Sequence, residues 1–190
     1  MNGTSMSAPN ACGSIALLLS GLQEAGRSWA PHSIRRAIEN SATPIPGMDR
    51  FSLGAGMINV PGAWAYLQDN AGRDDDQVRY DVTTGGRYAG RGVYLRESWD
   101  QQQPATVPVT IDPIFPRDAP KRDRVDFERT IRFESTADWI DAPRQVLLMH
   151  GGRRFSIEVD PTGLEPGVHF GEVLGFDAAS SESGPLFRVP

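Results

Sequence analysis

A serine stands near the start of the chain in a setting that could make it a nucleophile. Residues 3–9 read Gly-Thr-Ser-Met-Ser-Ala-Pro and run directly into a long apolar stretch. A serine hydroxyl attacks a carbonyl only when a base removes its proton and hydrogen-bond donors stabilise the oxyanion that forms. If Thr4 caps a helix, Ser5 is its first residue, and free amides with the positive dipole end lie where that charge develops. Gly3 has no side chain, so a substrate backbone can come close.

The apolar stretch after Ser5 predicts a helix over residues 5–25, with Gly26 as its C-terminal stop. Two neighbouring stripes nearly encircle it with small and apolar side chains: Ala11, Ile15, Leu18, Leu22 and Cys12, Ala16, Leu19. Such a helix must be buried against other elements. No run of parallel strands precedes it, so we expect the chain to be a piece of a larger protein and Met1 to be an internal residue.

These residues resemble the nucleophile motif of the subtilisin-like serine peptidases, Gly-Thr-Ser-Met-x-x-Pro. After a second helix predicted over 32–40, residues 54–60 read Gly-Ala-Gly-Met-Ile-Asn-Val. That run is similar to the Gly-x-Gly-x-Ile/Val-Asn stretch that closes the catalytic domain of this family. Within the superfamily, residues 7–13, with Asn10 where most members have histidine, and residues 184–190 resemble the tripeptidyl peptidase II family.

The resemblance implies that Ser5 is catalytic and that the backbone of Gly3, Thr4 and Ser5 meets the substrate, with the Ser5 N–H as an oxyanion donor. Subtilisin-like triads run Asp, His, Ser along the chain, so the base and its orienting carboxylate are expected upstream. The oxyanion asparagine is expected there too, and Asn2 is not assigned that role. The isolated chain is therefore expected to be inactive.

The resemblance further implies a peptidase that releases tripeptides from the free N-termini of oligopeptides. We expect a cytoplasmic homo-oligomer that needs neither a cofactor nor a metal. The alternative is a noncatalytic β-module, a spacer or assembly element of a secreted subtilisin-like endopeptidase. An upstream signal peptide would favour the secreted protein, whereas a long insertion between the catalytic Asp and His would favour the tripeptidyl peptidase II family.

The candidate residues also have other interpretations. A serine at a helix start often has no chemistry, although the full motif favours the nucleophile. The Ser, Asp, His order of the α/β-hydrolases requires Gly-x-Ser-x-Gly, and Ser7 stands where the second glycine belongs. Each histidine has an ordinary structural interpretation: His32 at a helix start, His150 before a turn and His169 in a strand. Cys12 is the single cysteine, expected as a small buried core residue.

Composition limits the partners. Hydrophobic residues make up 39% and charged residues 23% of the chain, and no apolar run is long enough to cross a membrane. These values are typical of a soluble globular protein. The net charge of −5 argues against nucleic acid, whose phosphates call for a basic patch.

The spacing of apolar residues changes around residues 71–77, which we interpret as a linker between a peptidase segment (1–70) and a β-domain (78–190). The run Asp74-Asp75-Asp76 lacks the spacing of a calcium loop and favours a solvated linker. Beyond it, alternation of apolar and polar residues predicts about seven or eight strands, among them 78–83, 92–96, 106–111, 125–134, 155–159, 168–176 and 186–189. The fold class is therefore mixed: the end of an α/β subtilisin-like domain, with a buried nucleophile helix, a second helix and a closing strand, followed by a β-sandwich of immunoglobulin or fibronectin type. Trp139 is expected to be an aromatic anchor at the sandwich edge.

Overall fold

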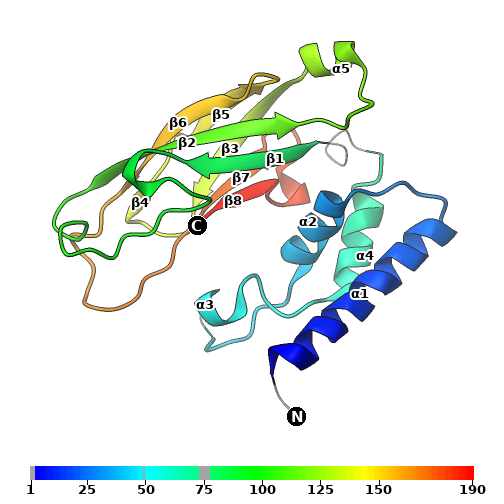
Figure 1. The fold of residues 1–190 in the computed structure, drawn as a ribbon, viewed down its shortest axis with the longest axis horizontal. Helices are drawn as coiled ribbons and strands as arrows, with labels where there is room; N and C mark the ends of the chain where they lie inside the picture. The colour runs from blue at the N-terminus through cyan, green and yellow to red at the C-terminus, as the bar shows by residue number, and fades with distance from the viewer. Residues whose placement is uncertain (1–2, 49, 73–77) are drawn as a thin grey trace. The chain divides into compact units, whose positions relative to one another are not determined.

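The computed structural model describes residues 3–48, 50–72 and 78–190. The chain divides into two compact units, residues 1–77 and 78–190 (Figure 1). Residues 73–77 of the predicted linker, including the three aspartates, lie outside the described residues.

The first unit is helical. Its helices are α1 (Thr4–Glu24), α2 (Pro31–Ser41), α3 (Arg50–Leu53) and α4 (Val60–Asp69). Helix α1 ends as its sequence predicts, because Gly26 adopts a left-handed φ of 63°. The Arg27 N–H donates to the Leu22 carbonyl and the Gly26 N–H to the Gln23 carbonyl, which together form a Schellman cap.

Helices α2 and α4 begin where side chains cap them. At the start of α2, the Ser33 hydroxyl donates to the Ala30 carbonyl at 2.8 Å and accepts the Ala30 N–H at 3.1 Å. Asn59 caps α4 by accepting the Gly62 N–H at 2.9 Å. The closing strand predicted over 54–60 is wrong: Met57 makes an isolated bridge with Thr43, and the asparagine of the motif serves as a helix cap.

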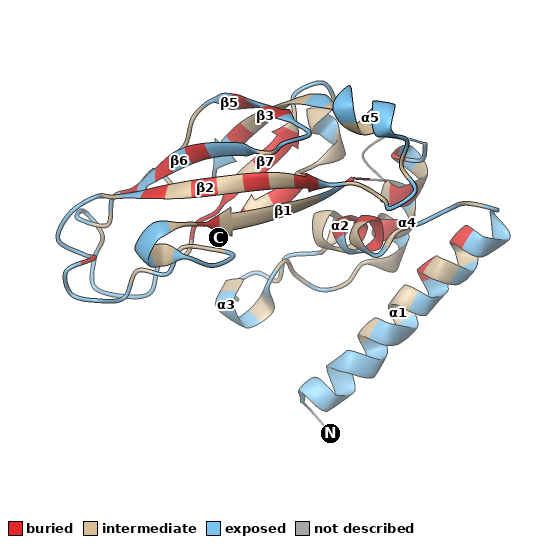
Figure 2. Ribbon diagram, turned by 45° about the horizontal axis from the view of Figure 1, so that its top comes forward, coloured by how far each residue is buried: buried red, intermediate tan, exposed pale blue. Residues whose placement is uncertain are grey.

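The core of the first unit is small. It consists of side chains from α1, α2 and α4: Leu18, Leu22, Ile34, Ala37, Ala63 and Leu67. The expected burial of α1 is not met within the described residues, since Leu18 and Leu22 are its only buried positions and residues 4–10 are exposed (Figure 2). Leu17 is 66% exposed. An apolar helix left open in this way agrees with the expectation that its packing partners lie elsewhere in a larger protein.

The second unit, described throughout 78–190, holds eight strands. They are β1 (Arg79–Thr84), β2 (Ala105–Ile114), β3 (Glu128–Ser135), β4 (Ile140–Asp141), β5 (Gln145–Met149), β6 (Arg153–Val159), β7 (Val173–Asp177) and β8 (Phe187–Val189). They form two four-stranded sheets, in the orders β1-β2-β6-β4 and β5-β3-β7-β8. All pairs are antiparallel. Two short 3₁₀ turns (86–88 and 181–183) and a short helix, α5 (Lys121–Val125), connect strands.

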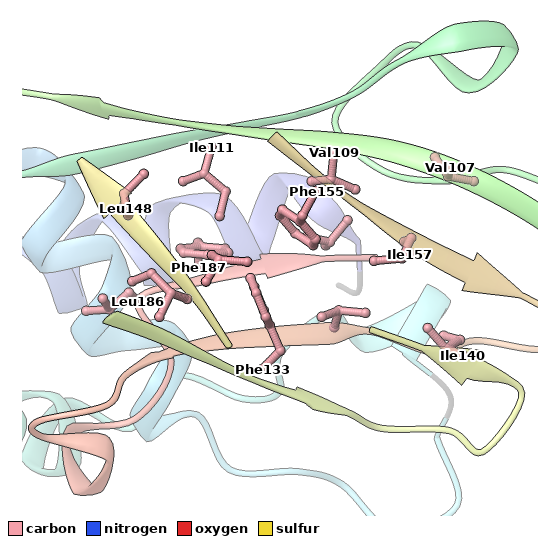
Figure 3. Close-up of a cluster of buried hydrophobic side chains, with 14 of the residues drawn as sticks. Val107, Val109, Ile111, Phe133, Ile140, Leu148, Phe155, Ile157, Leu186 and Phe187 are labelled. Carbon is pink, nitrogen blue, oxygen red and sulfur yellow. The ribbon is translucent and has the colours of Figure 1, made fainter. Parts of the chain in front are cut away.

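One apolar core lies between these two sheets (Figure 3). Alternate residues of β2 (Val107, Val109 and Ile111) are fully buried, as the period of two predicted. From the facing sheet, Phe133 stacks on Phe155 with ring centroids 4.6 Å apart. Trp139 packs against the edge of this core and is partly buried, in line with the expected anchor.

Several predicted strands differ from the structure. Residues 92–96 form no strand, and residues 168–172 form a loop, so β7 begins only at Val173. Strand β3 begins at Glu128 because the residues before it form α5, which starts after Pro120. Strand β5 was not predicted. It pairs with β3 although β4, a strand of the other sheet, lies between them in the chain, and a single segment does not reveal such a pairing.

Candidate active site at the start of helix α1

Ser5 is the second residue of α1, on an exposed first turn. The expectation that Thr4 caps the helix is wrong, because Gly3 holds the N-cap position and no side chain caps the helix there. Gly3 has φ 152° and ψ 169°, a backbone conformation that is essentially restricted to glycine. The motif glycine is thus required by the backbone itself, in addition to leaving room for a substrate.

The start of α1 offers backbone N–H groups. The first amides of a helix have no acceptor inside it, and Thr4 and Ser5 carry two of them. No acidic side chain lies in the first turn to neutralise the positive end of this 21-residue helix. An anion forming beside Ser5 would therefore meet unopposed donors and a favourable dipole.

Pro9 lies inside α1 without ending it. Because proline has no N–H, it leaves the Ser5 carbonyl without the donor that the fourth following residue normally supplies. The turn that bears Ser5 is consequently held by fewer backbone bonds than an ordinary helical turn.

None of the three histidines lies on helix α1. His32 lies in the first turn of α2, while His150 and His169 belong to the second unit. The ring Nε2 of His169 lies 2.8 Å from the Glu165 carbonyl oxygen, in a loop rather than the predicted strand. Asn2 lies outside the described residues. The part of the chain that the structure describes also contains no cluster of His, Cys, Asp or Glu suited to a metal, and no helix long and apolar enough to cross a membrane.

Cys12 was expected in a core and is exposed in this chain. It lies on the open side of α1 rather than among Leu18, Leu22 and their neighbours. Cys12 is exposed for the same reason as Leu17: helix α1 packs against the rest of the unit only through its last turns.

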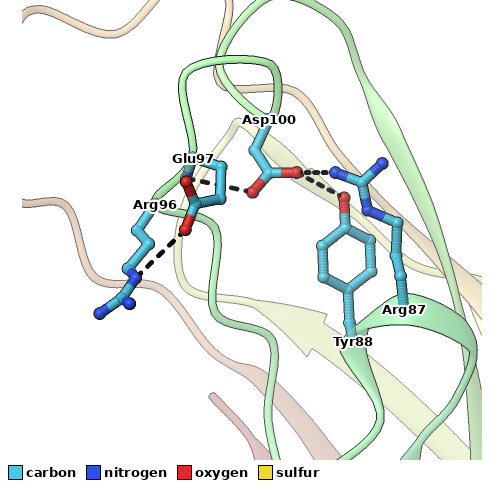
Figure 4. Close-up of polar contacts among 5 residues, drawn as sticks. All are labelled: Arg87, Tyr88, Arg96, Glu97 and Asp100. Carbon is cyan, nitrogen blue, oxygen red and sulfur yellow. Dashed lines mark hydrogen bonds and ion pairs between the residues drawn. The ribbon is translucent and has the colours of Figure 1, made fainter.

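The β-domain contains a buried carboxylate that no sequence pattern indicates. Asp100 is 5% exposed and accepts hydrogen bonds from the Arg87 guanidinium, from the Tyr88 hydroxyl at 3.1 Å and from the Glu97 N–H at 3.2 Å (Figure 4). Burial tends to raise the pKa of Asp100, but these three donors outweigh it and hold the pKa below its ordinary value. Burial, and then the Asp100 bond, raise the pKa of Tyr88. The three donors come from two loops, 85–89 and 97–100. Because the residues are not contiguous, no sequence motif predicts this cluster.

Arg87, Tyr88 and Asp100 border a hollow of about 200 Å³, which Trp99, Pro104 and Pro108 also line. Asp100 has each of its carboxylate oxygens occupied by donors of the same domain. The cluster therefore ties two loops together and is a structural feature of the domain.

Comparison with known proteins places these features in a family. The model of the first Ig-like domain of tripeptidyl-peptidase II matches residues 78–190, and that of the subtilase family matches residues 1–75. The chain belongs to the tripeptidyl-peptidase II family. This confirms the resemblance drawn from the Ser5 motif, from Asn10 and from residues 184–190.

Relatives of known identity align with the whole length of this chain. Tripeptidyl-peptidase 2 of Arabidopsis thaliana is 39% identical over 196 residues, covering 100% of this chain and 14% of the relative. That of Drosophila melanogaster is 35% identical over 192 residues, covering 100% and 13%. The crystal structure of tripeptidyl peptidase 2 superposes with a TM-score of 0.91 at 35% identity, covering 100% of this chain and 16% of that one.

The chain spans about 14% of the length of the curated relatives it matches. It corresponds to a subtilisin-like segment followed by a β-domain of the family. Family membership accounts for an apolar helix that finds few partners in these 190 residues, because most of a relative's length lies outside the matched segment.

Proposed function

We propose that the full-length parent of this chain is a serine peptidase in which Ser5 is the nucleophile. The observation that carries the proposal is the placement of Ser5 on the open first turn of α1, with the Thr4 and Ser5 amides free of helical partners. The match of residues 1–75 to the subtilase family supports it.

In the proposed reaction, the Ser5 Oγ attacks the scissile carbonyl carbon while a histidine takes its proton. The Ser5 N–H donates to the oxygen that becomes negative. Collapse of the tetrahedral species breaks the C–N bond, the histidine returns the proton to the leaving amine, and an ester on Ser5 remains. Water then hydrolyses that ester. The histidine and its aspartate belong to the parent upstream of Ser5, and the 190-residue chain alone is inactive.

The proposed substrates are oligopeptides with a free N-terminus, from which the parent releases tripeptides. The names of the four tripeptidyl-peptidase 2 relatives, at 34–39% identity over the whole chain, support this substrate class. Pyrolysin of Pyrococcus furiosus is only 27% identical over 92% of the chain. The four tripeptidyl-peptidase 2 relatives therefore match this chain over more of its length and at higher identity than pyrolysin does.

The proposal includes the β-domain and the setting of the parent. Residues 78–190 form a sandwich of immunoglobulin type, for which the two antiparallel sheets and the matching family model argue. This domain follows a linker at 71–77 and serves as a spacer or assembly module. The parent acts in the cytoplasm as a homo-oligomer, without a cofactor or metal.

The test uses the full-length parent, a fluorophosphonate probe, and peptides carrying a chromophore after the third residue. We expect the probe to label wild type and Ser20→Ala, a serine of the same helix, and not Ser5→Ala. We also expect release of the chromophore from peptides with a free amino terminus and little from N-acetylated ones. Labelling that survives Ser5→Ala would overturn the nucleophile assignment, whereas equal cleavage of acetylated peptides would overturn tripeptide release and leave the nucleophile in place.

A further inference from the structure

The carbonyl oxygen of Gly3 gathers three donors at the start of α1. It accepts the Met6 N–H at 2.9 Å, the Ser7 N–H at 3.2 Å and the Ser7 hydroxyl at 3.4 Å. The two amides follow from helix geometry, and any residue other than proline would supply them. The hydroxyl, at the long end of hydrogen-bonding distance, is the one donor that depends on the identity of a side chain.

This carbonyl determines how the peptide before the nucleophile is oriented. The Gly3 C=O and the Thr4 N–H belong to one planar group and point in opposite directions. Donors that draw the Gly3 oxygen toward the helix therefore turn the Thr4 N–H outward, beside Ser5. Gly3 itself resists this rotation little, because glycine allows many values of φ and ψ. Pro9 also leaves the following turn with one backbone bond fewer.

We propose that Ser7 is a positioning residue for Ser5, acting through the Gly3 carbonyl. Its hydroxyl holds the Gly3–Thr4 peptide in one orientation, and with it the outward amide and the backbone from which Ser5 projects. The inference rests on the proposed function, since it concerns the placement of the Ser5 nucleophile. Ser7 itself touches no reacting atom.

The chain supplies a matched control on the same helix. The Ser14 hydroxyl donates to the Asn10 carbonyl, four residues earlier, at 3.0 Å. Ser7 and Ser14 thus make the same kind of bond, but Ser14 lies nine residues after Ser5, more than two turns away, and its bond holds no peptide next to Ser5. A substitution that acts only through helix stability should affect both positions alike.

The experiment compares Ser7→Ala, Ser7→Thr and Ser14→Ala in the full-length parent, by the rate of fluorophosphonate labelling and by kcat and KM on a tripeptide substrate. Ser7→Ala should lower the labelling rate and kcat by about 3- to 10-fold with little change in KM, the range expected for one neutral hydrogen bond. Ser7→Thr should restore most of the rate, because a threonine hydroxyl can also reach the carbonyl four residues earlier. Ser14→Ala should label and turn over like wild type.

Equal slowing by Ser7→Ala and Ser14→Ala would overturn the proposal, as would a change confined to KM or wild-type rates in Ser7→Ala. Ser5→Ala separates this result from the proposed function. If Ser5→Ala retains labelling, the nucleophile assignment itself fails. If the probe does not label Ser5→Ala while Ser7→Ala is labelled and turns over like wild type, only the role of Ser7 fails.

Discussion

Gly21 of α1 faces the ring of Trp64 in α4 so closely that a methyl group at position 21 would lie 2.9 Å from the ring carbon Cζ3. The two helices therefore approach each other at a residue without a side chain, next to the buried Leu18 and Leu22. This contact explains why a long helix with poor burial elsewhere is still anchored at its C-terminal end.

The first prediction follows from that contact. In Gly21→Ala, overpacking should destabilise the helical unit by about 1–3 kcal/mol. The higher helix propensity of alanine should offset roughly 1 kcal/mol of that loss. Gly13→Ala on the same helix meets nothing within 4 Å, so it should gain that propensity alone and raise helix content. Far-ultraviolet circular dichroism of the 190-residue chain during thermal unfolding measures both variants. Stabilisation by both substitutions would contradict the close packing at Trp64.

The second prediction tests which face of the β-domain is core. Ile131 in β3 is fully buried, whereas Leu147 in the neighbouring β5 is 40% exposed. Ile131→Ala should lower the free energy of unfolding by about 2–5 kcal/mol, and Leu147→Ala by roughly 0.5 kcal/mol or less. Urea denaturation followed by tryptophan fluorescence distinguishes them. Similar losses of unfolding free energy at the two positions would mean that β3 and β5 pair in another register.

The third prediction concerns pH. Because the pKa of Asp100 is lowered in the folded state, its contribution to stability is complete above the ordinary aspartate value of about 3.9 and is lost as pH falls through the lower folded-state pKa. Asp100→Asn should therefore lower the Tm at pH 7, and its difference from wild type should shrink below pH 4. The raised pKa of Tyr88 acts at the other end, since its contribution is present below about pH 10 and is lost as pH rises further.

Asp160→Asn is the control for Asp100. The Thr162 hydroxyl and N–H lower the pKa of Asp160 too, but this residue lies on an exposed turn where solvent screens the interaction. Its effect on Tm should be several times smaller. Scanning calorimetry between pH 2 and pH 10 measures both, and a pH-independent difference between wild type and Asp100→Asn would refute the assigned role.

The fourth prediction concerns the helix start. Gly3→Ala places a side chain on a backbone with φ 152°, which costs about 1–3 kcal/mol or forces the peptide to rotate. We expect the full-length parent carrying Gly3→Ala to react with a fluorophosphonate about 10-fold more slowly or worse, because the turn bearing Ser5 shifts. Gly13→Ala should react at the wild-type rate. An unchanged rate in Gly3→Ala would mean that the helix start tolerates another conformation.

The sequence by itself determined the features that depend on neighbouring residues. The motif around Ser5, the long helix with its Gly26 stop, and the alternation in β2 and β6 are all contiguous patterns, whose physical meaning is set by helix or strand periodicity. The resemblance of the chain to the tripeptidyl-peptidase II family could be recognised for the same reason. Short, specific runs such as those at 3–9 and 184–190 carry it.

Only the tertiary structure decided features that join residues distant along the chain. It left α1 open along most of its length and brought Arg87 and Tyr88 onto the buried Asp100. It also set Gly21 against Trp64. Each outcome depends on packing between segments that lie 12 or more residues apart, or on the absence of such packing, and no local propensity encodes either one.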